Sequence, residues 1–385
     1  MSKNIRVLTW FNFFTEFKLY EPIAIIYFAQ VSGSFLLGTG VFSIARVSAA
    51  LFEIPTGVFS DRIGRRKTVI LGALCAILFI TFYAIGHSFW FLAIGAVFEG
   101  LSIAFYSGNN DALLYDTLLE KKEVHKYAQY LGQISKMFPA ALAISALLGG
   151  GVLAIWSLSL IVWISVIPQI ICLILAFRIS EPSIISKRSG NIYQNLKEAY
   201  SFFVRNRKLR LLSISSILGD GFGSASFQFQ SAFYNTIWPI WAIPIAKALS
   251  HIGLTIGFHY SGKIFKRFNV FKVIIAGNLY TRMINIASTA FPTILSPIIM
   301  TSSSIFYGPT LVGRNSLMQK EFRNEQRATM GSLNSFATSI FIGIVSLFLG
   351  FTADKLSPAH ALLIVQFFHA SNLIFYYKLF KFHKS

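Results

Sequence analysis

The sequence predicts an all-α membrane protein with twelve transmembrane helices, arranged as two pseudo-symmetric six-helix bundles. Three observations lead to this prediction. Of the 385 residues, 54% are hydrophobic and 13% are charged, whereas soluble domains carry roughly 25% charged residues. Apolar stretches of about 20 residues, the length that crosses the hydrocarbon core of a bilayer, recur along the chain. The basic residues gather in alternate gaps between these stretches.

The composition also excludes other classes of protein. The apolar content is too high for a disordered chain, and 2 Cys cannot build a secreted disulfide scaffold. A soluble enzyme would need more surface charge, and the sequence has no phosphate-binding loop of the pattern Gly-x4-Gly-Lys-Ser/Thr. We therefore expect neither an enzyme nor an ATP-driven pump, and we expect no cofactor and no metal.

The apolar stretches define the predicted spans in order along the chain. They are 5–30, 38–59, 68–86, 89–116, 128–148, 156–177, 211–233, 238–259, 272–291, 293–316, 328–352 and 358–377. The first span follows Lys3 and Arg6, as the apolar region of a signal peptide would. Glu16, Lys18 and Glu21 interrupt it, however, and no small-residue cleavage pattern follows, so we expect an uncleaved first span.

The charges of the loops predict the topology. One set of alternate gaps, which includes both termini, holds most of the 34 Lys and Arg residues, while the other set holds only Lys355. Cytoplasmic loops carry the excess of Lys and Arg in membrane proteins. We therefore expect both termini in the cytoplasm and the chain in the plasma or inner membrane. The net charge of +19 is then a topology signal rather than a sign of nucleic-acid binding.

The chain divides into two halves of similar pattern. Six spans lie in residues 1–177 and six in residues 211–385, with a cytoplasmic linker at 178–210. Landmarks repeat at an offset of about 200 residues: Gly57 with Gly257, Phe105-Tyr106 with Phe306-Tyr307, Glu120 with Glu321, and Gly132 with Gly331. The shared offset favours a duplicated six-span unit, the architecture in which a site at the seam can be exposed to either side of the membrane.

The linker predicts a helix that lies in the membrane interface. After a Ser-rich stretch at 180–190, Ile192, Leu196 and Tyr200 recur at helical spacing, with basic residues between and after them. A plain basic linker is the alternative.

The loop between the second and third spans carries the most specific motif. It reads Gly57-Val-Phe-Ser-Asp61-Arg62-Ile-Gly64-Arg65-Arg66-Lys67. The pattern of Gly, three residues, Asp, Arg, any residue, Gly and then basic residues resembles the signature loop of the major facilitator superfamily, and it lies where that family places it. The resemblance implies the two-bundle fold of these secondary transporters. Gly57 would allow close contact with a neighbouring helix, and Gly64 would permit a tight turn.

The resemblance further implies that this loop is a conformational latch. Asp61 would face the positive N-terminus of the eleventh span. Asp61 and Arg65 would join an acid at the end of the fourth span, either Asp116 or Asp111, and hold the cytoplasmic side shut in the outward-facing state. The corresponding loop of the second half, 257–267, keeps a Gly and the basic residues but has no Asp, so only the first half should carry the full latch.

The fifth span bears on a resemblance to drug/proton antiporters of the same superfamily. These usually carry a Gly-Pro pair two residues before a Gly-Gly pair in this span. Here Gly149-Gly150 is present and the Gly-Pro pair is not.

Charged residues inside the predicted spans are candidates for a transport site. A charge at the bilayer centre costs roughly 2.5–3.5 kcal/mol on insertion scales, so such residues pair, become neutral or face a wet cavity. Glu21, Arg46 and Glu99 lie at one depth, roughly 12–15 Å below the outer face at about 1.5 Å per residue. We expect a coupling cluster in which one carboxyl is free to titrate; a fixed ion pair with a spectator acid is the alternative.

Two further sets of polar residues fall inside spans. Asn12, Glu16 and Tyr20 recur every four residues, which predicts one helical face that lines the cavity; a stripe buried against another span is the alternative. Lys136 of the fifth span and Asp220 of the seventh lie at similar depth from the cytoplasmic side and are predicted to pair. Asp220 follows a glycine and precedes another, and it is a candidate proton or substrate site.

Together these features predict a secondary transporter that moves a small organic solute by alternating access. Proton coupling is favoured because membrane acids can titrate, and efflux is the leading direction. One alternative is a proton-coupled or facilitative importer on the same fold; another is a transporter-like receptor or assembly protein without a transport cycle. The expected partners are the lipid bilayer, a small-molecule substrate and protons, with no nucleic acid, and we expect a monomer.

Overall fold

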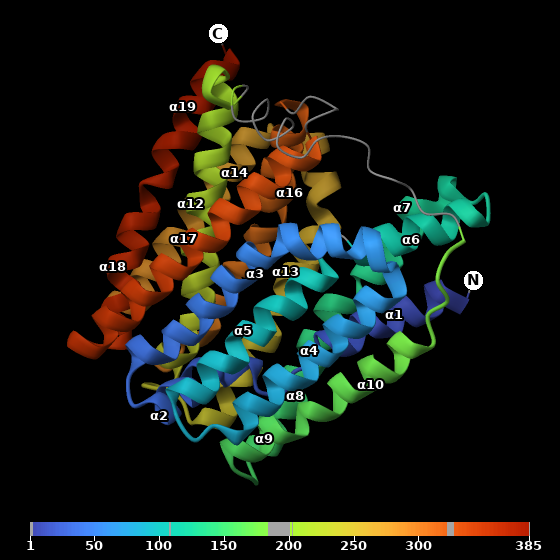
Figure 1. Cartoon of the computed structure of the whole chain (residues 1–385). Helices are drawn as coiled ribbons and strands as arrows, with labels where there is room; N and C mark the ends of the chain where they lie inside the picture. The colour runs from blue at the N-terminus through green and yellow to red at the C-terminus, as the bar shows by residue number, and fades with distance from the viewer. Residues whose placement is uncertain (1–2, 108, 184–200, 202, 322–326, 385) are drawn as a thin grey trace. The chain divides into compact units, whose positions relative to one another are not determined.

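The structure is a computed structural model of the whole chain, and it describes residues 3–107, 109–183, 201, 203–321 and 327–384 (Figure 1). Every regular element within these ranges is a helix, so the predicted all-α class is confirmed. The chain forms two compact units. Unit 1 comprises Met1–Arg188 and Ile240–Ala248, and unit 2 comprises Ser189–Pro239 and Leu249–Ser385. The predicted interfacial helix of the linker falls largely at 184–200, outside the described residues, so the predicted linker boundaries stay a prediction.

Unit 1 is built mainly from the helices of the first half of the chain. They are α1 (Lys3–Thr15), η1 (Glu21–Ile23), α2 (Ala24–Ser32), α3 (Phe35–Ile63), α4 (Arg65–Ile85), α5 (Phe89–Tyr106), α6 (Asn109–Glu120), η2 (Val124–Lys126), α7 (Tyr127–Ser135), α8 (Met137–Leu153), α9 (Leu158–Ile164), α10 (Val166–Phe177) and η3 (Ile240–Ala242). Buried apolar side chains join Leu8 and Phe11 of α1 to Val69 of α4, Leu113 of α6 and Cys172 of α10. This core holds together the helices that surround the candidate site.

Unit 2 contains the helices of the second half. They are α12 (Arg207–Tyr234), α13 (Ile243–Arg267), α14 (Val270–Ala290), α15 (Ser296–Ser302), α16 (Ser304–Glu321), α17 (Arg327–Lys355), α18 (Pro358–Ala370) and α19 (Asn372–Lys384). The first residues of α13, through Ala248, belong to unit 1. The core of unit 2 joins Leu209 of α12, Phe271 of α14, Met318 of α16 and Tyr376 of α19.

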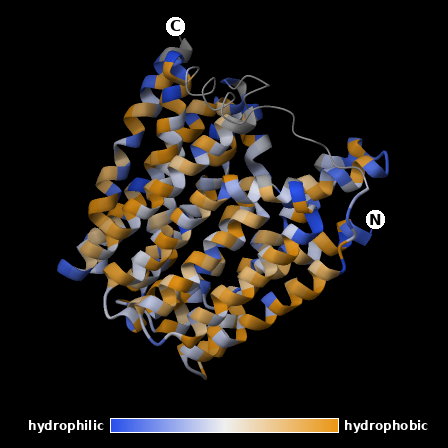
Figure 2. Ribbon diagram, in the orientation of Figure 1, coloured by the Kyte–Doolittle hydropathy of each residue, from blue (hydrophilic) through white to orange (hydrophobic). Residues whose placement is uncertain are grey.

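Eight helical stretches are long and apolar enough to cross a membrane, and apolar residues run along most of their length (Figure 2). They are Phe35–Gly57, Arg65–Ile85, Phe89–Glu120, Gln129–Leu153, Leu158–Phe177, Ile240–Arg267, Met330–Lys355 and Pro358–Lys381. The other four predicted spans are also helical, but 5–30 and 293–316 are interrupted, while 211–233 and 272–291 are more polar. The count of twelve spans therefore stays a prediction.

Local signals set several helix ends. Ser34 caps α3, since its hydroxyl accepts a hydrogen bond from the Leu37 backbone N–H at 3.1 Å. Gly33 ends α2 with a φ of +86°, a left-handed conformation that glycine adopts without strain. Pro55 and Pro309 lie inside α3 and α16, so a proline does not by itself end a helix in this chain.

Candidate functional site

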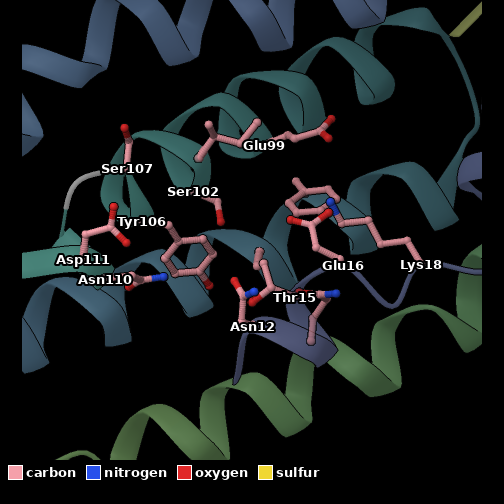
Figure 3. Close-up of a pocket in the computed structure, with 14 residues that line it drawn as sticks. Asn12, Thr15, Glu16, Lys18, Glu99, Ser102, Tyr106, Ser107, Asn110 and Asp111 are labelled. Atoms are coloured by element: carbon pink, nitrogen blue, oxygen red, sulfur yellow. The ribbon is translucent and has the colours of Figure 1, made fainter. Parts of the chain in front are cut away.

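Unit 1 contains a polar cavity of about 350 Å³ (Figure 3). Its lining comprises Asn12, Thr15, Glu16, Lys18, Ala76, Phe79, Glu99, Ser102, Ile103, Tyr106, Ser107, Asn110, Asp111 and Gln169. These residues come from α1 and the segment after it, from α4, α5, the start of α6 and α10. Asn110 and Asp111 lie at one end of the cavity, and Glu16 and Lys18 lie at the other (Figure 3).

The first predicted span is interrupted where it meets this cavity. Helix α1 ends at Thr15, and the next helical turn, η1, begins at Glu21. Pro22 lacks the backbone N–H that a continuous helix would use to satisfy the carbonyl of Lys18. The chain between α1 and η1 therefore runs without regular structure through the wall of the cavity.

Two side chains near and in α10 satisfy the backbone groups that the break exposes. Ser165 Oγ accepts a hydrogen bond from the Leu19 N–H at 3.1 Å. The side-chain amide of Gln169 donates to the carbonyl of Phe14 at 3.3 Å. Irregular backbone at membrane depth is tolerated where it is buried in protein or lines a wet cavity, because its hydrogen bonds must be met there. The break is thus supported by the packing of unit 1.

This break corrects one prediction from the sequence. Asn12 and Glu16 both line the cavity, but Tyr20 does not share their face, because the helix ends before it. Tyr20 is instead buried, and its ring packs against those of Phe28 and Tyr83.

The fourth predicted span is interrupted at the same cavity. Helix α5 ends at Tyr106, and α6 begins at Asn109. Ser107 from the break and Asn110 and Asp111 from the start of α6 line the cavity. Two discontinuous spans therefore meet here, an arrangement that brings helix ends and unwound backbone to a site inside a membrane.

The cavity lining is rich in carboxylates. Glu16, Glu99 and Asp111 are acidic, and of the described lining residues Lys18 alone is basic. The Tyr83 hydroxyl donates a hydrogen bond to Glu99 Oε2 at 2.6 Å. No ion pair within 4.0 Å joins Glu16 or Asp111 to a base in the described part of the chain. The described residues also include no group of three or more His, Cys, Asp or Glu that could hold a metal ion.

Lys18 lies at the centre of the charges in this region. Its ammonium stands over the ring of Phe79, with Nζ 5.5 Å from the ring centroid. It interacts electrostatically with Glu16, Glu99, Glu21 and Arg46. The predicted trio of Glu21, Arg46 and Glu99 therefore meets in one network, although of the three only Glu99 lines the cavity. The sequence prediction omitted Lys18 from the site, and its place between two acids of an apolar span was the signal that could have found it.

Gln169 is a cavity residue that sequence reasoning missed. It is 1% exposed, and its side-chain oxygen has no hydrogen-bond partner among the described residues. Asn110 Oδ1, which also belongs to a lining residue, is likewise without a partner there. Unsatisfied buried polar atoms are rare in folded proteins, so these two oxygens are unusual acceptors among the residues that line the cavity. A single Gln in an apolar helix forms no pattern that a sequence would reveal.

The signature loop between α3 and α4 holds a buried ion pair. Arg65 Nε lies 3.4 Å from Asp116 Oδ2, and the two side chains are 7% and 0% exposed. Arg65 Nη1 donates to Ser60 Oγ at 2.9 Å, and Ser60 Oγ donates to Asn109 Oδ1 at 2.7 Å. Of the two acids that the family resemblance left open, Asp116 is the one beside Arg65, while Asp111 lines the cavity.

The two glycines of this loop differ in their surroundings. Gly64 has a φ of +96°, in the range that favours glycine. A Cβ at Gly57 would meet nothing within 4 Å, so the predicted close helix contact at Gly57 is not made within unit 1. The side chain of Asp61 lies outside the described part of the structure, and Arg62 is exposed.

Glu181, beyond the end of α10, caps the N-terminus of α4. Its two carboxylate oxygens accept hydrogen bonds from the backbone N–H groups of Arg65 at 2.6 Å and Arg66 at 2.7 Å. Arg66 Nη2 also donates to the carbonyl of Phe177 at 3.2 Å. A carboxylate is stabilised at a helix N-terminus, where the backbone N–H groups lack partners and the dipole is positive. A Cβ at Gly64 would lie 2.8 Å from Glu181 Oε1, so this glycine also makes room for the cap.

In unit 2, Asp220 of α12 and Arg314 of α16 form an ion pair between the two helices. Arg314 Nη2 lies 2.6 Å from each carboxylate oxygen of Asp220, and the Arg314 side chain is 4% exposed. Ser216 Oγ also donates to Asp220 Oδ2 at 3.3 Å. Arg314, rather than the predicted partner Lys136, therefore occupies this carboxylate; Lys136 is an exposed residue of unit 1.

A second buried base of unit 2 has neutral partners. Arg282 is 8% exposed, and its Nη1 bonds to Gln366 Oε1 and to His369 Nδ1. The His369 ring in turn stacks on that of Phe222. Unit 2 thus holds its described intramembrane charges in contacts with its own side chains.

Comparisons with known proteins agree with this architecture. A family profile described as Major Facilitator Superfamily matches residues 7–346. The chain is 24% identical over 380 residues to an uncharacterized MFS-type transporter from Methanocaldococcus jannaschii, covering 94% of each chain. It is 31% identical over 143 residues to an uncharacterized transporter from Buchnera aphidicola, or 37% of this chain and 34% of that one.

A further relative has a named activity. Over 234 residues the chain is 23% identical to a Na(+), Li(+), K(+)/H(+) antiporter from Planococcus maritimus, with 57% of this chain and 54% of that one aligned. The chain thus spans about a third of the Buchnera protein and about half of the antiporter.

Solved structures share the fold at low sequence identity. The nucleoside transporter NupG superposes with a TM-score of 0.81 at 13% identity, over 99% of this chain and 100% of that chain. A bacterial homolog of the human lysosomal transporter Spinster, solved inward-facing and unoccupied, gives a TM-score of 0.77 at 15% identity, over 97% and 96%.

Proposed function

The chain belongs to the Major Facilitator Superfamily, and we propose that it carries a small organic solute out of the cell by alternating access, in exchange for protons. It is a membrane transporter and not an enzyme. The observation that carries the proposal is the polar cavity of unit 1, at which two interrupted spans meet. Discontinuous helices mark binding sites in transporters that work by rocking two bundles about a fixed site.

The size and lining of the cavity suit a small organic molecule. A volume of about 350 Å³ lies near the lower end of the roughly 300–1,000 Å³ typical of small-molecule pockets. The rings of Phe79 and Tyr106 provide apolar surface, and Asn12, Ser102 and Gln169 provide hydrogen-bonding groups. A mixture of this kind fixes the orientation of a solute while burying its apolar part.

The unpaired carboxylates support proton coupling. Glu16 and Asp111 have no ion-pair partner within 4.0 Å among the described residues, so neither carboxylate is held in a fixed ion pair, and in this proposal they are the groups that protons and solute share. A proton and a solute that compete for the same carboxylates are bound in turn, and their movements are then opposite in direction. The antiporter from Planococcus maritimus is a relative whose name pairs cation movement with proton movement.

The signature loop supplies the conformational step in this proposal. The Arg65–Asp116 pair ties α4 to α6, and the Glu181 cap ties α4 to the end of α10. With both termini in the cytoplasm, as the loop charges predict, this face is cytoplasmic and the latch holds the outward-facing state. Labelling of single cysteines introduced at the 62–67 loop and at the 121–126 loop of intact cells tests that orientation, because both should be shielded from an impermeant reagent.

Proteoliposomes with an imposed pH gradient test the transport proposal. The full-length protein is reconstituted, and a panel of amines, sugars, amino acids, carboxylic acids and drugs is offered while a trapped dye reports the internal pH. We expect at least one solute to move against its gradient with a counterflow of protons, and an uncoupler to abolish this movement.

Protein-free liposomes provide the baseline for this assay. Solute movement that survives collapse of the pH gradient would overturn proton coupling. Movement of solute in the same direction as protons would replace efflux by import. A panel in which no solute moves at all would overturn transport itself.

A further inference from the structure

From the chemistry of the unit 1 cavity we infer that its ligand is a small organic cation, an amine or a guanidinium compound, and that the Lys18 ammonium is a tethered occupant that this ligand displaces. The inference rests on the proposed function and names the class of solute for the same cavity. It depends on four features of the lining: its charge, its helix ends, its unpartnered oxygens and its aromatic ring.

The charge of the lining sets the sign of the ligand. Glu16, Glu99 and Asp111 supply three carboxylates and Lys18 one ammonium, so the lining carries a net charge of −2 when all four are ionised. A pocket of one sign with low-dielectric walls concentrates ligands of the opposite sign and repels those of its own. The lining therefore attracts a cation and disfavours an anion.

The helix ends at the cavity also favour a cation. Thr15 and Tyr106, both lining residues, are the last residues of α1 and α5. The C-terminal end of a helix carries a partial negative charge, which stabilises a cation. The one helix that begins at the cavity, α6, already has Asp111 in its first turn to meet its positive end. The backbone thus adds to the attraction for positive charge.

Two buried oxygens of lining residues are acceptors without a partner in the described chain, and a side-chain rotation on binding would present them to the N–H groups of such a ligand. The amide nitrogen of Gln169 is fixed by its hydrogen bond to the Phe14 carbonyl, which leaves the oxygen of this buried side chain without a partner in the described chain. Asn110 Oδ1 is a second such acceptor. An ammonium or guanidinium has only donors to offer, whereas a carboxylate or phosphate ligand has only acceptors. The available groups match the cation.

The ring of Phe79 already holds a cation. Lys18 Nζ lies 5.5 Å from its centroid, inside the roughly 6 Å range of cation–π attraction. A solute ammonium would find its own best position over this ring and beside Glu16, so it must displace Lys18. The cavity of about 350 Å³ far exceeds the roughly 30 Å³ that one water occupies, so it fits an organic ion better than a bare alkali cation.

Three probes of nearly equal size and different charge test the inference. They are phenethylamine, phenethyl alcohol and 3-phenylpropionate, titrated calorimetrically into the purified full-length protein in nanodiscs at neutral pH. We expect phenethylamine to bind at least about tenfold more tightly than the other two, since one charge contact in a partly shielded site corresponds to a decade or more in affinity. NaCl, LiCl and KCl are titrated in a separate arm.

Variants assign the binding to this cavity. Glu16→Gln should weaken phenethylamine binding about tenfold or more, and Lys18→Met, which removes the tethered competitor, should tighten it severalfold. Glu123→Gln is the matched control: this partly exposed residue of the loop before α7 accepts a hydrogen bond from Lys126 Nζ at 2.6 Å. That bond lowers the pKa of Glu123, so the control also removes a charged carboxylate. A thermal melt of each variant shows that it is folded.

Several results would overturn the inference. They are tighter binding of 3-phenylpropionate or phenethyl alcohol, no binding of phenethylamine by folded protein, binding that Glu16→Gln leaves unchanged, and Glu16-dependent binding of alkali cations alone. Failure of this inference is separable from failure of transport. If proteoliposomes move neutral or anionic solutes, transport stands and the cation class falls; if phenethylamine binds but no solute moves, the reverse holds.

Discussion

The two units place their fixed charges differently. In unit 1 the buried ion pair, Arg65–Asp116, lies at the signature loop, and the interrupted spans present carboxylates without ion-pair partners to a cavity. In unit 2 the pair Lys208–Glu321, between the start of α12 and the end of α16, is 35% and 20% exposed, and the tight pair, Asp220–Arg314, joins the interiors of the same two helices. The comparison separates charges that hold the protein together from charges that are left free for a ligand.

This difference predicts that substitutions of charged residues have different effects in the two units. A buried pair is stabilising only as a pair, because removing one partner strands the other in a low dielectric. A carboxylate that faces a cavity without an ion-pair partner contributes little to the stability of the protein. Its role is then to bind a ligand or an ion. Substitutions at paired sites should therefore lower the free energy of unfolding, and substitutions at cavity sites should change the affinity for the ligand.

The largest expected effect is on the Asp220–Arg314 pair. Arg314→Met removes both 2.6 Å contacts and leaves the Asp220 carboxylate without its ion-pair partner between α12 and α16. Breaking a buried pair costs about 3–5 kcal/mol, and we expect unit 2 to lose stability by an amount near the lower value, since the Asp220 side chain is 21% exposed. Chemical unfolding in detergent, followed by circular dichroism, measures the loss.

A double variant separates the stranded charge from lost packing. Asp220→Asn combined with Arg314→Met should recover most of the stability that Arg314→Met loses, because neither charge is then left alone. If the double variant is as unstable as the single one, Arg314 stabilises the protein through packing rather than through its charge. The pairing of charges would then not distinguish unit 2 from unit 1.

The second effect concerns the loop of unit 1. Asp116→Asn leaves Arg65 buried with the Ser60 hydroxyl as a remaining neutral partner. Because the Arg65–Asp116 contact is 3.4 Å, longer than that of Arg314, we expect a somewhat smaller loss of about 2–3 kcal/mol. Solute flux in proteoliposomes should also slow, since the pair is part of the proposed latch.

The matched control lies five positions earlier on the same helix. Asp111→Asn makes the same chemical change at an exposed residue that lines the cavity. Its stability should stay within about 0.5 kcal/mol of the parent, as for surface substitutions in general. Equal losses at both positions would contradict the division of the acids into paired and free.

Asp111 and Asp116 also show which features could be predicted from the sequence and which could not. The apolar stretches and loop charges were enough for the membrane class, and the motif at 57–67 was enough for the family, while the latch role of that loop stays a prediction. The choice between Asp111 and Asp116 needed the structure. Residues five apart on a helix differ by about 140° in direction, so the two acids point to different surroundings, and the sequence does not show which one meets Arg65.

The interrupted spans mark the other limit of sequence reasoning. Pro22 lies at the start of the short helix that follows the break, whereas Pro55 and Pro309 lie inside continuous helices, so a proline does not determine the outcome by itself. The difference depends on Ser165 and Gln169, which satisfy the exposed backbone from more than a hundred residues away. Contacts of this kind have no local pattern, which is why the cavity was predicted in part, through Asn12, Glu16 and Glu99, and not as a whole.

A smaller effect is expected for the cap on α4. Glu181→Gln replaces a carboxylate that accepts two backbone N–H bonds with an amide that can accept at one oxygen. Loss of an N-terminal cap of this kind costs about 1 kcal/mol. Chemical unfolding would show it, with Glu120→Gln as the control, because among the described residues Glu120 accepts from the exposed hydroxyl of Ser183 alone. A loss below that of the control would mean that water replaces the cap.

The smallest effect should come from the Lys208–Glu321 pair of unit 2, and it bears on whether this partly exposed pair is held as firmly as the Arg65–Asp116 pair of unit 1. Lys208→Gln removes an ion pair of 2.6 Å between partly exposed side chains, and such pairs contribute about 0.2–1 kcal/mol. The difference from the parent should vanish in 1 M salt, where the screening length falls to about 3 Å, whereas that of Asp116→Asn should persist because its partner is buried. A salt-resistant loss of 2 kcal/mol or more at Lys208, on the order of that expected at Asp116, would show that unit 2 also has a strongly held ion pair near the start of α12. The contrast between the two units would then lie only in their membrane interiors.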